Sequence, residues 1–178
     1  MTFIAPAETK IGHVHLKVAD LDRAVAFYTD MLGFTVTARY GTGAAFLSAG
    51  GYHHHIGLNT WESKDGTPPP PHHTGLYHTA ILYPSRADLA RVFKRVVDAG
   101  WLIDGAADHG VSEAIYFRDP DGNGVEIYRD RPQPEWPMDE GGNLKMFNAR
   151  LDLNALLAGA AHHTIAASCT AMASSTSS

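Results

Sequence analysis

The chain repeats one pattern of strand and helix. Residues 11–18 and 75–83 both alternate apolar and polar side chains, as a half-buried strand does. Asp20 and Ser85, which lie 65 positions apart, then provide N-caps for helices with apolar residues at helical spacing, each ending at a glycine. Two copies at this offset predict a duplicated module rather than a solenoid, which needs several shorter repeats.

Short extended stretches follow each predicted helix. They lie at 34–39, 44–48 and 52–61 in the first copy, and near 101–103, at 113–118 and at 125–128 in the second. The run Asp119-Pro-Asp-Gly-Asn-Gly124 is a strong turn signal between the last two. Each copy is therefore predicted to be a βαβββ module. We predict an α+β fold in which two such modules form a half-open mixed β-barrel with the helices outside.

The prolines and the composition shifts predict how the chain is divided. The linker contains four consecutive prolines, which form a stiff spacer. The predicted parts are an N-terminal extension at 1–9, module 1 at 10–61, the linker at 62–74, module 2 at 75–129, a C-terminal segment with a helix at 130–167, and a disordered tail at 168–178.

Composition narrows the class of protein. The 178 residues are enough for a substantial core, and 44% are hydrophobic. The net charge of −5 does not favour nucleic acid or an anionic membrane as a partner. The N-terminus shows no signal-peptide pattern, and Cys169 alone cannot form a disulfide framework. We expect a soluble cytoplasmic protein. Its unusual feature is a total of 11 histidines.

Strand alternation predicts which polar side chains share a surface. Ile56 and Leu58 are expected to share a face with His54, which leaves His55 on the opposite face. Glu126 is likewise expected to point away from the helix. His13 lies opposite the apolar residues of its strand. The module offset then adds His78 to the same polar surface.

Two histidines and one carboxylate are the ligands of a 2-His-1-carboxylate site, an arrangement known for non-haem Fe(II). His13, His78 and Glu126 would supply it and leave coordination positions open for substrate and O₂. Each residue also has an ordinary explanation. The run 53–55 can be an exposed histidine tract, Glu126 an exposed strand residue, and the turn at 119–124 a weak imitation of a calcium loop.

Two segments carry a family resemblance. GHVHLKVADLDRAVAFYTDMLGF and YFRDPDGNGVEIY resemble the vicinal-oxygen-chelate superfamily of glyoxalases, bleomycin-resistance proteins and extradiol dioxygenases. GYHHHIGLNTW, GLYHTAILYP and DHGVSEAIYFRDPDGNGVEIYRDRP are similar to its catechol 2,3-dioxygenase branch. The resemblance covers roughly residues 10–155.

The resemblance implies roles for single residues. It implies that His13, His78 and Glu126 bind the metal, Fe(II) first, with Mn(II), Ni(II) or Zn(II) as alternatives. It implies that His55, with His54 as the fallback, is an acid–base residue. Tyr116 would contact the substrate oxygen, and His109 would be a further histidine of the site.

The implied function is extradiol ring cleavage of a catechol-type substrate by O₂, in the catabolism of aromatic compounds. Glyoxalase I, which resembles this chain in fold, adds a glutamate on the strand near 54–58, where this sequence has no carboxylate. The alternatives are a metal-dependent glyoxalase-like lyase or isomerase, and a non-enzymatic small-molecule-binding protein. A homodimer is implied as well. Trp136, Met146 and Phe147 are expected to cover the mouth of the site.

Overall fold

A computed structural model describes residues 2–159 of the chain. The chain divides into two compact units, Met1–His73 and Thr74–Ser178. Each unit contains one strand–helix–three-strand module, so the predicted α+β class with two βαβββ modules is confirmed. The predicted domain boundaries stay a prediction, and the predicted tail at 168–178 lies outside the described residues. Among the described helices, none is long and apolar enough to cross a membrane.

Unit 1 is a four-stranded sheet with one helix. Its elements are β1 (Val14–Lys17), α1 (Leu21–Ala26), a π-helical turn (Phe27–Met31), β2 (Thr35–Tyr40), β3 (Ala44–Ser48) and β4 (Ile56–Asn59). The strand order is β1-β4-β3-β2, with β1 parallel to β4. Asp20 caps α1 as predicted, because its side chain accepts a hydrogen bond from the Arg23 backbone N–H.

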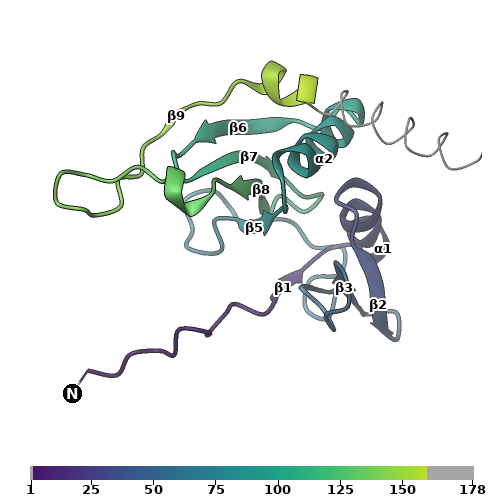
Figure 1. The fold of residues 1–178 in the computed structure, drawn as a ribbon. Coiled ribbons are helices and arrows are strands. Elements are labelled where there is room, and N and C mark those ends of the chain that lie inside the picture. Colours follow the sequence, from purple (N-terminus) through teal and green to yellow (C-terminus); the bar gives the residue numbers. More distant parts are fainter. Residues whose placement is uncertain (1, 160–178) are drawn as a thin grey trace, which may run out of the picture. The chain divides into compact units, whose positions relative to one another are not determined.

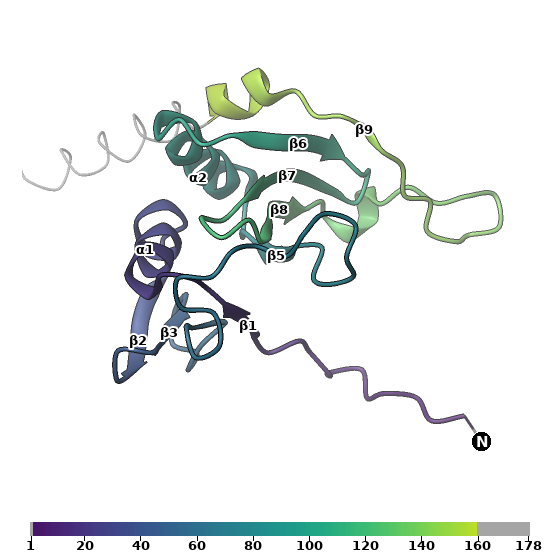
Figure 2. The same cartoon turned by 180° about the vertical axis from the view of Figure 1, so that it is seen from behind.

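Unit 2 is a five-stranded sheet with a longer helix on one face (Figure 1). Its elements are β5 (Thr79–Leu82), α2 (Arg86–Asp98), β6 (Ile103–Asp108), β7 (Ser112–Arg118), β8 (Gly124–Asp130), a 3₁₀ turn (Gln133–Glu135) and β9 (Ala149–Arg150). The order is β5-β8-β7-β6-β9. Figure 2 shows β9 beside the end of β6.

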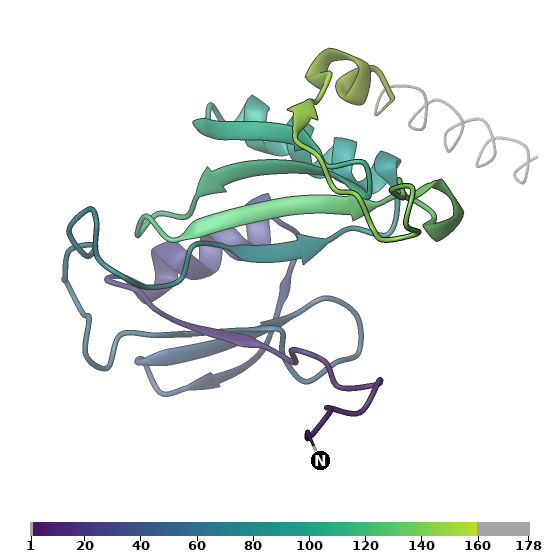
Figure 3. The same cartoon turned by 90° about the vertical axis from the view of Figure 1, so that its left-hand side faces the viewer.

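The core of unit 2 lies between α2 and the sheet. Leu89, Phe93 and Val96 of α2 are buried, as are Ile115 of β7 and Ile127 of β8. Residues of the opposite alternation on these strands face away from α2. The long strands β6, β7 and β8 that provide this free face are seen in Figure 3.

Several strands differ in extent from the sequence prediction. β4 begins only at Ile56, although the His55 backbone still donates to the Leu47 carbonyl at 2.8 Å and accepts the Val14 N–H at 3.0 Å. β6 extends to Asp108, well beyond the short stretch predicted near 101–103. β9 was not predicted, since a strand of two residues has no periodicity to detect. The helix predicted in the C-terminal segment is present at 153–159 within the described range.

Candidate active site

Strand pairing places His78 and Glu126 on the free face of the unit 2 sheet. β5 runs parallel to β8, with Thr79 opposite Val125 and Ala80 opposite Glu126. Val125 and Ile127 are buried toward α2, so Glu126 between them projects from the other face, as the sequence alternation predicted. His78 directly precedes β5 at the same end of the sheet.

His78 and Glu126 form a close pair of donor atoms. His78 Nε2 lies 2.9 Å from Glu126 Oε2. His78 Nδ1 is buried and has no hydrogen-bond partner among the described residues, so Nε2 is the nitrogen that engages the carboxylate. Two ligand atoms at right angles on one metal ion, with bonds of about 2.1 Å, lie roughly 3.0 Å apart. The separation is therefore compatible with two neighbouring positions on a divalent ion, once Nε2 has lost the hydrogen that it donates to the carboxylate.

Tyr116 extends this pair across the sheet. Tyr116 pairs with Glu126 in the β7–β8 register, and the Tyr116 hydroxyl lies 3.3 Å from Glu126 Oε1. Burial first, and then the nearby Glu126 carboxylate, raise the pKa of Tyr116 to about 12. The phenol therefore stays protonated at neutral pH and keeps a hydrogen atom to donate.

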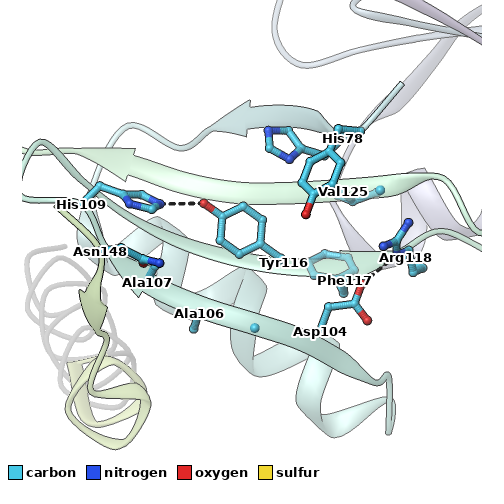
Figure 4. A pocket seen from close by; sticks show the side chains of 13 residues that line it. His78, Asp104, Ala106, Ala107, His109, Tyr116, Phe117, Arg118, Val125 and Asn148 are labelled. Atoms are coloured by element: carbon cyan, nitrogen blue, oxygen red, sulfur yellow. Dashed lines mark hydrogen bonds and ion pairs between the residues drawn. The ribbon is translucent and has the colours of Figure 1, made fainter. Parts of the chain in front are cut away.

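His109 lies at the other side of Tyr116, in the turn between β6 and β7. Its Nε2 is 2.7 Å from the Tyr116 hydroxyl, and its Nδ1 is 3.1 Å from the backbone oxygen of Phe147 (Figure 4). His78, Glu126, Tyr116 and His109 thus form one continuous chain of polar contacts within unit 2.

A pocket of about 430 Å³ opens over this chain of residues. His78, His109 and Tyr116 line it together with Tyr77, Asp104 and Arg118. In Figure 4 the Asp104–Arg118 ion pair, with a separation of 2.7 Å, lies across the pocket from His109. The volume falls within the range of small-molecule sites, and polar groups line the pocket on both sides.

Unit 1 holds the other predicted residues, and it groups them differently from the prediction. The ring beside His13 is that of His54, with the ring centroids 4.4 Å apart, whereas His55 had been predicted there. His54 also contacts Phe46 and His53. The alternation rule does not hold at this point because residues 52–55 precede the strand.

His55 turns instead toward the end of β3. Its Nδ1 lies 3.1 Å from Ser48 Oγ and accepts the Ala49 backbone N–H at 3.3 Å. Since a backbone N–H can only donate, Nδ1 is unprotonated and the neutral ring carries its hydrogen on Nε2. The acid–base role of His55 stays a prediction.

The strand register of the two units identifies the position that corresponds to Glu126. In unit 1, Val14 pairs with Ile56 as Thr79 pairs with Val125 in unit 2. Gly57 therefore corresponds to Glu126, and a Cβ at Gly57 would lie 2.9 Å from the His15 ring. Unit 1 thus offers a histidine, His13, at the position of His78, but no carboxylate at the position of Glu126.

The predicted metal ligands come from both units, His13 from unit 1 and the other two from unit 2. Across residues 2–159, no three His, Cys, Asp or Glu side chains are grouped closely enough to hold a metal ion. The structure brings together His78, Glu126, Tyr116 and His109. The complete ligand set stays a prediction.

Sequence reasoning missed the residues that hold His109. Gly110 has φ +78°, and a Cβ there would lie 2.5 Å from the Phe147 ring. The His109-Gly110 pair is a local signal for a turn. Nothing in the pattern indicated that Phe147 would reach it, although Phe147 had been expected near the mouth of the site.

The chain matches a known family over most of its modules. Residues 10–127 match the family model of the Glyoxalase/Bleomycin resistance protein/Dioxygenase superfamily. The solved structure of a glyoxalase/dioxygenase from Nostoc punctiforme has a TM-score of 0.61 at 21% identity, over 74% of this chain and 99% of that one. A glyoxylase/bleomycin resistance protein/dioxygenase domain from Frankia gives 0.58 at 26% identity, over 70% of this chain and 100% of that one.

Curated relatives include dioxygenases and a transferase. The catechol-2,3-dioxygenase of Bacillus subtilis is 48% identical over 56% of this chain, and biphenyl-2,3-diol 1,2-dioxygenase 3 of Rhodococcus globerulus is 31% identical over 68%. The chain spans 35% and 63% of their respective lengths. The glutathione transferase FosA of Serratia marcescens is 30% identical, over 66% of this chain and 79% of that protein. The chain therefore belongs to the glyoxalase/bleomycin resistance protein/dioxygenase superfamily.

Proposed function

We propose that the protein is a non-haem Fe(II)-dependent extradiol dioxygenase, which cleaves the ring of a catechol-type substrate with O₂. The observation that carries this proposal is the His78–Glu126 pair, 2.9 Å apart and directly beside the Tyr116 hydroxyl. Its nitrogen and oxygen donors suit a divalent transition metal, and the adjoining pocket has room for a small ring. The similarity to catechol- and biphenyldiol-cleaving relatives supports the same conclusion.

The proposed metal ligands are His13, His78 and Glu126. Fe(II) is the first candidate, and Mn(II), Ni(II) or Zn(II) are the alternatives. When bound, the ion supplies Lewis-acid and one-electron chemistry. Two neutral histidines and one carboxylate leave a divalent ion with a net charge of +1, which matches a singly deprotonated catechol. Gly57 at the position corresponding to Glu126 supports a site with three protein ligands rather than four.

The remaining residues would handle the substrate and its protons. The Tyr116 hydroxyl would hydrogen-bond a substrate oxygen at the edge of the pocket. His109, 2.7 Å from that hydroxyl, holds it in position. We assign acid–base transfer to His55, which would take a proton from the catechol. The basic nitrogen of its neutral ring is Nδ1, which accepts the Ala49 backbone N–H. His54, which contacts His13, is the alternative.

We further propose that the substrate is an aromatic diol, that O₂ is the co-substrate, and that the protein acts as a cytoplasmic homodimer. The chain spans 35% and 63% of the two dioxygenase relatives. The C-terminal segment after residue 130, or a second copy of the chain, would form one side of the substrate pocket.

A metal-dependent transferase, lyase or isomerase is the second candidate. It is favoured by the FosA relative, of which this chain spans a larger share than of either dioxygenase. Such an enzyme would share the ligands but would not consume O₂. Oxygen dependence therefore separates the two candidates.

The test is anaerobic reconstitution with Fe(II), followed by catechol and then air. The proposal expects a yellow ring-cleaved semialdehyde that forms only with both iron and O₂. Glu126→Gln should abolish the colour, and Glu62→Gln, on a side chain that is 77% exposed, should preserve it. A protein that binds the metal stoichiometrically and yields no colour with a range of catechols would contradict the proposal.

A further inference from the structure

The C-terminal segment reaches back onto His109. We call residues 145–150 the strap. β9, at its end, pairs with β6, with Ala149 opposite Asp108. One step earlier, the Phe147 N–H donates to the His109 carbonyl at 3.3 Å. The strap thus forms the edge strand of the sheet, and Phe147, just before that strand, lies beside His109 of the proposed active site.

The same residue of the strap contacts the imidazole itself. The Phe147 backbone oxygen lies 3.1 Å from His109 Nδ1. A carbonyl oxygen can only accept a hydrogen bond, so Nδ1 must carry the hydrogen. In a neutral ring Nε2 is then unprotonated and can only accept.

This assignment decides where the hydrogen of Tyr116 goes. The Tyr116 hydroxyl has one hydrogen and two acceptors, His109 Nε2 at 2.7 Å and Glu126 Oε1 at 3.3 Å. The hydroxyl hydrogen points to the unprotonated His109 Nε2, because that contact is the shorter of the two. Glu126 Oε1 then accepts no hydrogen bond from Tyr116.

We propose that the strap is a positioning element that fixes the Nδ1–H tautomer of His109 through the Phe147 carbonyl, and thereby directs the Tyr116 hydroxyl toward His109 and away from Glu126. The effect of the strap on catalysis rests on the proposed function. The tautomer of His109 does not depend on that function.

The strap packs closely on Gly110, where there is no room for a side chain. A Cβ there would lie 2.5 Å from Phe147 Cε1 and 2.8 Å from Pro137 Cγ. Gly110→Ala would therefore force the rings of Phe147 and Pro137 to move, and Pro137 also holds the strap, because its carbonyl accepts the Lys145 N–H at 2.9 Å. Gly142 provides a control for backbone strain, since its φ of +77° is almost the same as the +78° of Gly110 and a Cβ there would meet nothing within 4 Å. Both substitutions place a side chain at a positive φ, but only the one at Gly110 also clashes with the strap.

The experiment is two-bond ¹H–¹⁵N correlation NMR of the metal-free protein, labelled with ¹⁵N-histidine. His109→Gln assigns the signals, and a pH of about 8 keeps an ordinary histidine neutral. The proposal expects the Nδ1–H pattern for His109 in the wild type. An Nε2–H pattern or a doubly protonated ring would overturn it, whether or not any variant folds.

The variants then test the role of the strap. Gly110→Ala should lose the Nδ1–H pattern, and Gly142→Ala should retain it. If Gly110→Ala folds and retains the pattern, the strap does not set the tautomer. In the ring-cleavage assay Gly110→Ala should lower kcat about tenfold with little change in KM. This is less than the roughly 100-fold or more that follows loss of a proton-transfer group, because the strap only positions its neighbours. A wild type with the expected tautomer but no ring cleavage would refute the proposed function and leave the positioning inference standing.

Discussion

His78 Nε2 and Glu126 Oε2 lie 2.9 Å apart, at the ends of two parallel strands of unit 2. The parallel β5–β8 register and the burial of Val125 and Ile127 toward α2 place both side chains on the free face. The pair links the fold to its proposed chemistry, because it needs only one further ligand to complete the predicted site.

Glu126→Gln should weaken binding of a divalent metal by at least about 100-fold, since even residues that only support a ligand account for 10–100-fold. The amide keeps the size of the side chain but removes the charge. Isothermal titration with Mn(II) or Zn(II) measures the effect, and Glu62→Gln is the exposed control. Unchanged affinity in Glu126→Gln would remove this residue from the ligand set.

Tyr116→Phe should lower kcat about 10- to 100-fold in the ring-cleavage assay while metal affinity stays the same, because only the hydrogen bonds of the hydroxyl are lost. Tyr40→Phe, at a residue that is 72% exposed, is the control for the loss of a phenol group. Full turnover in Tyr116→Phe would show that the hydroxyl does not act on the substrate.

The two candidate acid–base residues can be separated by substituting each alone. His55→Ala should retain metal and lose turnover by at least about 100-fold if His55 transfers the proton. His54→Ala should then lose much less. The reverse order would assign the role to His54, whose ring lies 4.4 Å from that of His13. Single-turnover assays on iron-loaded protein give the comparison.

Glu113 should be the carboxylate that matters most for stability in unit 2. It is 5% exposed and lies 2.9 Å from both Arg86 Nε and Arg129 Nε. Glu113→Gln should destabilise the protein by about 1–3 kcal/mol, because the largely buried Arg129 loses its counter-charge while Arg86, 38% exposed, stays partly solvated. Asp98→Asn, in the exposed ion pair with Lys94, should cost less than about 1 kcal/mol. Urea unfolding measures both, and equal effects would contradict the prediction.

Tyr83 should make the fold sensitive to alkali. Burial raises the pKa of Tyr83 above its ordinary value of 10.0. Above about pH 10 the unfolded chain loses this proton while the folded chain keeps it, so the free energy of unfolding falls as pH rises. Tyr83→Phe should flatten that decline relative to wild type, and Tyr40→Phe should not. Thermal melts between about pH 9 and pH 12 measure the decline of stability with pH. The same decline in Tyr83→Phe as in the wild type would contradict this prediction.

The residues alone predicted the position of two members of the unit 2 site. Alternation on one strand placed Glu126, and the module offset placed His78, whereas Tyr116 and His109 were implied only by the family resemblance. The alternation rule failed at His54, because residues 52–54 lie before the paired part of the strand and alternation applies only within a strand. The contact between Phe147 and His109 could not be predicted, since it joins residues 38 positions apart through a backbone oxygen.

The central claim is that this protein inserts O₂ into a catechol ring. The most direct measurement is mass spectrometry of the product formed from catechol, the Fe(II)-loaded protein and ¹⁸O₂. The account predicts a ring-opened product that carries both oxygen atoms of one O₂ molecule, with one O₂ consumed per catechol. A protein that binds metal and catechol but yields no labelled ring-opened product would contradict it.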